Sequence, residues 1–556
     1  MNAVKKSNNK KVCFITVNQV DLGIRLLSGV LKASGNSVRL INLATREGKW
    51  VHKYPDIIKG QLAPLVEDYH IIGISTVDMF LKRAEDLALW LAENMEKPVI
   101  MGGNHVELYP EESIQTPGVK AICAGQGVKT ISELVEKWGT GKEFDIPDFW
   151  FKHSDGTIKK NQVLPPLSTK DYYDLPLPDY SYDDYWYLYN NEIKKMPERS
   201  GPVPVDQHQI GHPDTCVITF SQGCSNHCDF CNVAALTRKY REHGNKQVSW
   251  LRCKPIDRII EEFQEIKKHN PNMKFIVFMD NNFAAHPLAT LRKLADFMSK
   301  EIKLPFYCMA SPNNLNREKL ECLIKAGLKE LNLGIESNAA INKKFYGRNI
   351  SDEVVINIAR LLNEYKDIVH PFYDFLIFNP AETEQDLLTT LELVRKLPMP
   401  FDLVTHHLTV APVLPLYHRL LKTVGRLPRD SSKLYESNWH DADPREYLDW
   451  PTFYLNLLME FMAGPHTSDK IGRLPRWTSD LKNHLVMTAL KKHNPELADK
   501  LKTATEKESL DWLLRDDIRT LMQQHKNMLL EIYDKLPPIR YTNQVVEYRI
   551  NPCIKQ

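Results

Sequence analysis

The sequence predicts an α/β protein made of two series of alternating strands and helices, followed by a helical C-terminal region. Three observations predict this class: apolar runs typical of buried parallel strands recur, amphipathic helices separate them, and the alternation fades beyond about residue 435. A chain of 556 residues is long enough for several domains. We expect a sheet domain at 1–138, a linker at 139–212, a barrel at 213–434 and a helical domain at 435–556.

Charge and hydropathy exclude several classes of protein. The chain has 72 Lys and Arg against 70 Asp and Glu, a formal net charge of +2, which does not favour a nucleic-acid binder. Its apolar runs stay shorter than the roughly 18 residues that a membrane-spanning helix needs. The polar segment Met1–Lys11 lacks the apolar core of a secretory signal. We therefore expect a cytoplasmic protein without a membrane span.

The N-terminal series predicts a doubly wound, Rossmann-like sheet. It starts with the continuous apolar strand Lys11–Val17, and a helical pattern with Ile24 and Leu27 follows. The other strands are expected at 38–43, 71–75, 98–101 and 119–123, and the other helices near 55–69, 81–96 and from about 128. Ligands of such sheets bind beyond the carboxyl ends of the strands. Small and polar residues occupy these points at Gly73–Thr76, Gly102–His105 and Gly125–Gly127.

The region 139–212 is rich in Pro, Asp and Tyr, and its periodicity is poor. We interpret it as a linker that wraps around its neighbours.

The second series predicts a (β/α)6-type partial barrel, in which a helix separates each pair of strands. The strands are expected at 216–220, 275–279, 306–310, 330–335, 372–378 and 403–410. The helices are expected near 256–268, 288–300, 317–326, 352–365 and 384–396. The reactive site of such a barrel lies at the carboxyl ends of its strands.

A cysteine-rich loop follows the first strand of the second series. Cys224, Cys228 and Cys231 stand at CxxxCxxC spacing, so one loop can bring three thiolates to one metal centre. A structural zinc site usually takes four ligands in two pairs, and no second pair accompanies this one. Three ligands on an iron–sulfur cubane would leave one iron open. We interpret the other seven cysteines as small buried apolar residues: Cys13, Cys123, Cys216, Cys253, Cys308, Cys322 and Cys553.

This loop resembles that of the radical S-adenosylmethionine superfamily, in which an aromatic residue precedes the last cysteine, as Phe230 does here. The resemblance implies that Cys224, Cys228 and Cys231 hold a 4Fe-4S cluster whose open iron binds S-adenosylmethionine. One electron then cleaves the sulfonium and yields a 5′-deoxyadenosyl radical. Thiolates suit such a soft metal centre.

Further segments resemble the parts of that superfamily that bind S-adenosylmethionine. The segment 280–283 stands where the family has its GGE motif, Gly334–Ser337 looks like G-x-E-S, and Phe378–Thr383 resembles the G-x-P-G-E-T turn without two of its glycines. The resemblance assigns S-adenosylmethionine binding to Phe230, Asp280, Asn281, Asn282, Glu336, Ser337 and Arg348.

The N-terminal series narrows the resemblance to the cobalamin-binding radical S-adenosylmethionine enzymes. Asp174–Asp179 is similar to their D-x-L-P-x-P-D linker, Gly102–His105 to a G-G-x-H loop, and Gly125–Gly127 to a G-E-G turn with Gln for Glu. His105 is not part of a D-x-H-x-x-G string, in which the His binds cobalt in many cobalamin domains, so His105 is not assigned as a ligand. A degenerate sheet that binds no cobalamin remains an alternative. The resemblance assigns cobalamin binding to Ser75, Thr76, Gly102, Gly103, Asn104, Gly125 and Gly127.

The resemblance implies a C-methyltransferase that acts on an unactivated carbon through the adenosyl radical and methylcobalamin. An oxidative cyclase or rearrangement enzyme of the same architecture is the alternative, and a non-catalytic iron–sulfur or zinc redox sensor is the alternative of another class. Methylthiolation is disfavoured, because that group has three more cluster cysteines in its N-terminal domain and only Cys13 and Cys123 occur here. The expected partners are a small-molecule or peptide substrate and an electron donor such as flavodoxin or ferredoxin, with no nucleic acid. The sequence assigns no catalytic residue.

Overall fold

A computed structural model describes residues 10–18, 21–44, 53–196, 215–242, 244–425, 448–462 and 464–466, with a few isolated positions beyond them. The chain forms two compact units. Unit 1 comprises Met1–Cys224, Asn232–Met279 and Asn543–Gln556, and unit 2 comprises Ser225–Cys231 and Asp280–Thr542. The expected helical domain at 435–556 lies largely outside the described residues.

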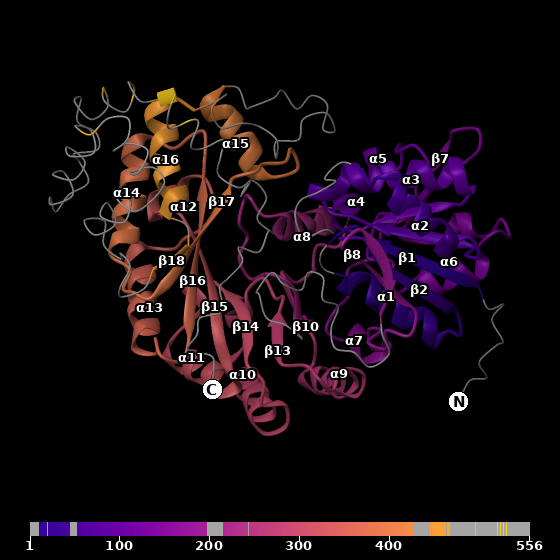
Figure 1. The fold of residues 1–556 in the computed structure, drawn as a ribbon, viewed down its shortest axis with the longest axis horizontal. Coiled ribbons are helices and arrows are strands. Elements are labelled where there is room, and N and C mark those ends of the chain that lie inside the picture. The colour runs from indigo at the N-terminus through magenta and orange to yellow at the C-terminus, as the bar shows by residue number, and fades with distance from the viewer. Residues whose placement is uncertain are drawn as a thin grey trace. The chain divides into compact units, whose positions relative to one another are not determined.

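Unit 1 contains a nine-stranded sheet in the order β7-β6-β5-β4-β3-β1-β2-β8-β9. Its parallel centre is formed by β1 (Lys11–Thr16), β2 (Ser37–Asn42), β3 (Ile71–Ser75), β4 (Val99–Gly102) and β5 (Val119–Cys123). Helices cover both faces, and each face has its own apolar core cluster. This arrangement confirms the predicted doubly wound sheet (Figure 1).

The helices of unit 1 connect these strands or follow them. They are α1 (Leu22–Ala33), α2 (Asp56–Val66), α3 (Leu81–Met95), α4 (Asn104–Leu108), α5 (Pro110–Ser113), α6 (Ile131–Lys137), α7 (Asp171–Asp174), α8 (Asn232–Glu242) and α9 (Ile256–His269), with short 3-10 turns at Asp78–Phe80 and Glu143–Asp145. The helices α2, α3, α6 and α9 begin within a few residues of their predicted positions, because the apolar stripe that faces the sheet sets their extent, whereas the short helices α4, α5 and α7 were not predicted.

The region 139–212 differs from the expected linker, because it adds four strands to this sheet. These are β6 (Phe149–Lys152), β7 (Ile158–Lys159), β8 (Tyr185–Tyr189) and β9 (Glu192–Lys195). The strands β8 and β9 form a hairpin through Asn190 and Asn191, whose φ angles of 49° and 65° are those a tight hairpin turn requires. Two adjacent asparagines between apolar and alternating runs were the available sequence signal for this hairpin.

Unit 1 also includes the strands that flank the cysteine loop. The strand β10 (Thr215–Ile218) pairs in parallel with β13 (Phe275–Phe278). The strand β11 (Ser221–Gly223) pairs in antiparallel orientation with β12 (Leu251–Cys253), and α8 lies between them in the chain. Neither this short hairpin nor α8 was predicted.

Unit 2 continues the alternation of strands and helices. Its strands are β14 (Phe306–Ala310), β15 (Leu328–Glu336), β16 (His370–Ile377) and β17 (Phe401–His407), which run parallel, and β18 (Gly464–His466), which is antiparallel to β17. Its helices are α10 (Leu288–Phe297), α11 (Arg317–Ala326), α12 (Ala339–Lys344), α13 (Asp352–Glu364), α14 (Glu384–Arg395), α15 (Pro415–Val424) and α16 (Trp450–Met462). A π-helical turn at Met298–Ile302 extends α10, and 3-10 turns lie at Phe283–Ala285 and Pro312–Asn314.

Local capping sets the helix starts in unit 2. The side chains of Asn316, Asn338 and Ser351 accept backbone hydrogen bonds at the starts of α11, α12 and α13. Thr383 and Asp386 form a reciprocal capping box at the start of α14. Figure 1 shows α13 and α14 along one side of β15, β16 and β17.

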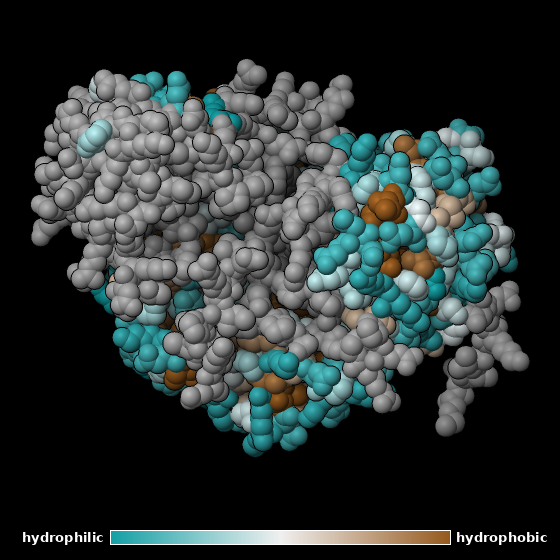
Figure 2. Space-filling model, in the orientation of Figure 1, coloured by the Kyte–Doolittle hydropathy of each residue, from teal (hydrophilic) through white to brown (hydrophobic). Residues whose placement is uncertain are grey.

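The surface shows no large apolar area among the described residues of the face in Figure 2, where hydrophilic side chains predominate. Large apolar side chains that are exposed, such as Ile57 and Tyr173, are scattered. Within the described part of the chain, none of the helices is long and apolar enough to cross a membrane.

Candidate functional site

Unit 1 contains a cavity of about 430 Å³ at the carboxyl ends of β3, β4 and β5 and alongside α1. Six of the seven residues predicted to bind cobalamin line it: Ser75, Gly102, Gly103, Asn104, Gly125 and Gly127. The seventh, Thr76, does not line it. Its side chain is buried, and its backbone N–H donates to the Gly102 carbonyl at 2.9 Å.

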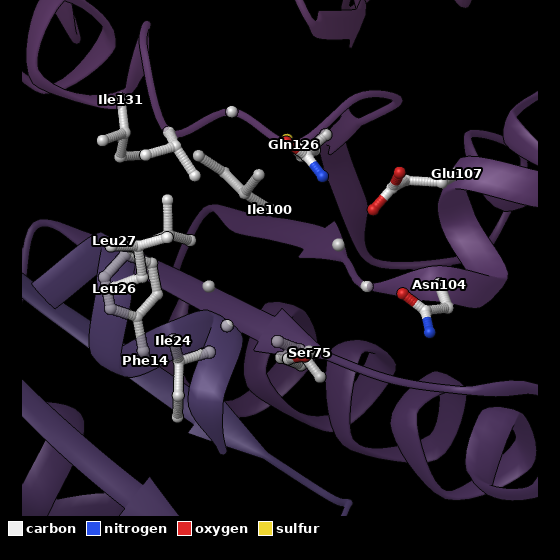
Figure 3. Close-up of a pocket in the computed structure, with 18 of the residues that line it drawn as sticks. Phe14, Ile24, Leu26, Leu27, Ser75, Ile100, Asn104, Glu107, Gln126 and Ile131 are labelled. Atoms are coloured by element: carbon white, nitrogen blue, oxygen red, sulfur yellow. The ribbon is translucent and has the colours of Figure 1, made fainter. Parts of the chain in front are cut away.

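The cavity has an apolar end and a polar end (Figure 3). The apolar end is formed by side chains from β1, α1, β4 and α6: Phe14, Ile24, Leu26, Leu27, Ile100 and Ile131. The polar end carries Ser75, Asn104, Glu107 and Gln126. An apolar pocket with a few convergent polar groups is typical of cofactor sites. It fits part of a large cofactor that joins apolar ring surfaces to amide side chains, as cobalamin does.

Glu107 also lines the cavity, although no motif in the sequence predicts it. It lies on the short helix α4, and its Oε2 accepts a hydrogen bond of 2.7 Å from the Tyr240 hydroxyl of α8. Burial raises the pKa of Glu107 to about 7, and Asp148 adds to the shift, while the Tyr240 hydrogen bond and Arg252 oppose it. The polar end of the cavity therefore holds a carboxyl group that changes charge near neutral pH.

Gln126 stands where the resembled turn has Glu, and its amide connects two other segments of unit 1. Its Nε2 donates to Oε1 of Gln222 at 3.0 Å, and its Oε1 accepts from the Leu167 backbone N–H at 2.7 Å. A carboxylate could accept the Leu167 N–H but could not donate to Gln222 Oε1. The amide thus fits this position better than the family's acid would.

The glycines around the cavity have different physical roles. A Cβ on Gly103, whose φ is +104°, would lie 2.3 Å from the Thr76 carbonyl oxygen, and one on Gly125 would lie 2.3 Å from the Asp148 carboxylate. A Cβ on Gly127, at φ +65°, would lie 2.7 Å from Cys123 Sγ. Packing within the chain therefore requires these three glycines. Gly102 differs, because its Cβ would meet only the Cβ of Cys123 at 3.5 Å.

His105 takes part in a hydrogen-bonded group within unit 1. Its Nδ1 lies 2.6 Å from Asp78 Oδ1, and Asp78 Oδ2 accepts from Asn232 Nδ2 at 2.8 Å. This group connects the start of α4 to the start of α8.

The three cysteines predicted to hold the cluster are divided between the two units. In unit 1, Cys224 follows β11, and its N–H donates to the Trp250 carbonyl at 2.8 Å. In unit 2, the N–H of Cys231 donates to the carbonyl of Cys228 at 3.3 Å, and Cys228 is buried. Phe230 packs edge to face against Tyr346, with ring centroids 5.3 Å apart.

Among the described residues, no three His, Cys, Asp or Glu side chains converge as a single metal ion requires. A cubane differs from a single ion, because its cysteines bind different irons. Three thiols within eight residues are the donors that an iron–sulfur cluster takes, so the residues present fit that group.

The Arg348 side chain contacts both the cysteine loop and the end of β15. Its Nη1 is 3.7 Å from Cys228 Sγ and donates to Glu336 Oε1 at 3.0 Å, and its Nη2 donates to the Gly334 carbonyl at 2.6 Å. Burial raises the pKa of the Cys228 thiol to about 11, and the Arg348 guanidinium opposes the shift. Burial also raises the pKa of Glu336, again against the effect of Arg348. The structure thus brings together Cys228, Glu336 and Arg348, which the sequence assigned to the cluster and to S-adenosylmethionine.

The other residues predicted to bind S-adenosylmethionine fall into two groups. Asn282 is buried, and its Nδ2 donates to Ser225 Oγ at 3.1 Å and to Asn314 Oδ1 at 2.7 Å. Asp280 is buried with its Oδ1 3.4 Å from His286 Nε2, whereas Asn281 is exposed. The segment 280–282 therefore approaches the cysteine loop through Asn282.

Ser337 belongs to the second group, whose side chains bond to the turn after β16 and to α14. Its Oγ donates to Glu382 Oε1 at 3.0 Å, inside a buried group with Thr390. Burial raises the pKa of Glu382 to about 8. Glu382 belongs to the predicted turn after β16, where Phe378 has φ +61° in place of the family's glycine. Phe378 thus adopts the left-handed backbone region that favours glycine.

Two family matches cover the two α/β regions. Residues 15–135 match the B12 binding domain, and residues 218–394 match the Radical SAM superfamily. A curated relative, the ribosomal protein uS12 methylthiotransferase RimO of Carboxydothermus hydrogenoformans, is 24% identical over 190 residues. That match covers 32% of this chain and 40% of the relative's length.

Solved structures share the fold at low identity. The radical S-adenosylmethionine methyltransferase TsrM from Kitasatospora setae, with cobalamin and a [4Fe-4S] cluster bound, is 14% identical with a TM-score of 0.54, over 73% of this chain and 74% of that one. The cobalamin-dependent S-adenosylmethionine radical enzyme OxsB with aqua-cobalamin is 15% identical with a TM-score of 0.55, over 95% of this chain and 74% of that one.

Proposed function

The chain belongs to the cobalamin-dependent radical S-adenosylmethionine enzymes, and we propose that within this family it transfers a methyl group to an unactivated carbon of its substrate. The observation that carries the proposal is the occurrence of both domains in one chain, with the predicted cobalamin residues around one cavity. TsrM, which shares the fold, is a methyltransferase with both cofactors bound. Membership of this enzyme family disfavours the alternative of a non-catalytic redox sensor.

The chain's own residues would bind and orient the cofactors. Cys224, Cys228 and Cys231 would hold the cluster, and Arg348 would contact the ligand Cys228 while Glu336 fixes its guanidinium. When bound, the cofactors supply hydrogen abstraction and a transferable methyl group. The buried surroundings of these residues would keep water from the reacting groups.

A labelling experiment tests the proposal. The reconstituted enzyme is incubated with a reductant, candidate substrates and S-adenosylmethionine carrying a trideuterated methyl group. We expect a product heavier than its substrate by one CD₃ in place of a hydrogen. The variant Cys228→Ala is the control and should give no such product. Turnover without deuterium in any product would contradict methyl transfer.

A second candidate is an oxidative cyclisation or rearrangement. It is supported by the likeness to OxsB, which extends over 95% of this chain and whose name does not specify methyl transfer. A product with the same carbon count as its substrate would favour this candidate.

Methylthiolation remains disfavoured despite the likeness to RimO, because the first 212 residues contain only Cys13 and Cys123.

A further inference from the structure

One face of the parallel strands in unit 2 is partly exposed, while the other is buried. Cys308, Leu331 and Phe375 on β14, β15 and β16 have no exposed surface. The residues that alternate with them, such as Asn332 and Asp374, are partly exposed. Period-two alternation places these two sets on opposite faces of the sheet. The partly exposed face is therefore available to a ligand.

The strand register brings polar residues from three strands onto this face. Met309 is paired with Asn332, Gly334 with Asp374, and Leu376 with His406. Paired residues in neighbouring strands point to the same face. Asn332, Asp374 and His406 therefore share the open face.

These three side chains form a connected group centred on one carboxylate oxygen. Asn332 Nδ2 donates to Asp374 Oδ1 at 2.9 Å, and His406 Nε2 lies 3.4 Å from the same oxygen. The side chains of Asp374 and His406 are 18% and 32% exposed. Asp374 Oδ2 has no hydrogen bond to any residue in the described part of the chain. A carboxylate with one oxygen fixed and the other open is a preformed acceptor for an N–H or O–H donor.

The surroundings of this carboxylate favour a ligand with an apolar body. Tyr307 and Phe372 contact each other edge to face at 6.4 Å, and Met309, Leu376 and Val404 lie at neighbouring positions of the same face. Asp374 and His406 also act on the pKa of Glu336, so the group lies within electrostatic range of the Glu336–Arg348 pair. Arg348 in turn contacts Cys228. The group is thus close to the reactive end of the strands.

We propose that Asn332, Asp374 and His406 bind the substrate, and that they take a molecule in which an ammonium or other N–H donor is attached to an apolar body. The N–H group donates to Asp374 Oδ2, while Asn332 and His406 hold the carboxylate in place. The inference rests on the proposed function, because it assumes that the reaction takes place at this end of unit 2.

A pair of probes tests the proposal on the intact, cofactor-loaded enzyme. 2-Phenylethylamine and 3-phenylpropanoate have similar bodies and opposite charge, and calorimetric titration under anaerobic conditions measures their affinities. We expect the wild type to bind the amine at least about tenfold more tightly, the lower end of what a charge-assisted hydrogen bond contributes. Asp374→Asn should abolish this preference, and Asp374→Glu should restore part of it.

The molecule provides a matched control in a second aspartate–histidine pair of the same strands. Asp402 Oδ1 lies 3.0 Å from His370 Nε2 near the amino ends of β16 and β17. Asp402→Asn should keep the preference for the amine. Iron content and circular dichroism show whether each variant is folded, and the wild-type comparison stands even if Asp374→Asn is not.

The proposal is overturned if the wild type does not bind the amine or binds both probes equally, or if folded Asp374→Asn keeps the preference. The proposed function fails separately, when the wild type binds the amine but no substrate acquires the labelled methyl group.

Discussion

The cavity of unit 1 and the open strand face of unit 2 use different means to form a binding surface. The cavity is built from apolar side chains and glycines, and its polar end carries one ionisable group, Glu107. The strand face and its carboxyl end carry pairs of ionisable side chains, among them Glu336–Arg348 and Asp374–His406. The comparison indicates that shape dominates in the first region and charge in the second. Substitutions that add volume should therefore be most harmful in unit 1, and those that remove charge in unit 2.

The largest expected effect is the loss of the iron–sulfur cluster in a variant that still binds cobalamin. Cys228→Ala removes a predicted cluster ligand, so iron content and the iron–sulfur absorbance should fall nearly to zero and S-adenosylmethionine cleavage should stop. Cobalamin binding in unit 1 should persist, as measured by the absorbance of the protein-bound cofactor. Loss of both cofactors in a folded variant would contradict the separation.

The next effect concerns the buried charges of unit 2. Arg348→Ala leaves Glu336 buried without its cation, so the free energy of unfolding should fall by about 3–5 kcal/mol. Chemical denaturation measures this change. The double variant Arg348→Met with Glu336→Leu is the control and should be much closer to the wild type, because neither charge remains. Equal losses in the two variants would show that packing, and not charge, dominates here.

Two neighbouring glycines test the role of shape in unit 1. Gly103→Ala forces a left-handed φ on alanine and a contact with the Thr76 carbonyl, which should cost about 2–4 kcal/mol of unfolding free energy. Gly102→Ala lacks both problems and should leave stability nearly unchanged. Its methyl group faces the cavity, so it should weaken cobalamin binding by about 1–3 kcal/mol in a titration. Unchanged cobalamin affinity in Gly102→Ala would indicate that the cofactor does not reach this end of the cavity.

The smallest effect tests the one ionisable group in the polar end of the cavity. The pKa of Glu107 is raised to about 7, so the folded protein binds more protons than the unfolded chain between about pH 4.5 and 7. Stability should therefore fall as the pH rises through this window, by on the order of 1 kcal/mol for each pH unit. Glu107→Gln should remove that part of the slope. Glu382 contributes a slope of the same sign, so the difference between the wild type and Glu107→Gln isolates Glu107.

The sequence predicts best those helices and strands whose ends are determined by neighbouring residues in the chain. The strands at 71–75 and 306–310 and the helix at 317–326 match the structure at both ends. In the helix, the Asn316 cap and Gly327, at φ +111°, mark the limits. The strands of 139–212 were missed because pairing with a distant sheet edge decides them, and the surrounding Pro and Asp residues hide the short apolar runs.

The candidate sites show the same division. The three cysteines and the glycines around the cavity stand in short sequence motifs, so they can be predicted from the sequence. Glu107 and Asp374 depend on tertiary neighbours, because Tyr240 and His406 are 133 and 32 residues away in the chain. The alternating pattern of the strands was a signal for Asn332, Asp374 and His406, but the strand register was needed to bring them together.

The irregular end of β15 constrains how this protein can change during evolution. The pairing of β15 with β16 shifts by one residue between Gly334 and Glu336, and Glu336 has a left-handed φ of +70°. The bulge sets the direction of the carboxylate that binds Arg348, so the length of this stretch is constrained as well as the identity of Glu336. Homologous chains should tolerate substitutions at Ile335 far better than the gain or loss of one residue there. A length change would turn the carboxylate away from Arg348 and release the guanidinium that contacts Cys228.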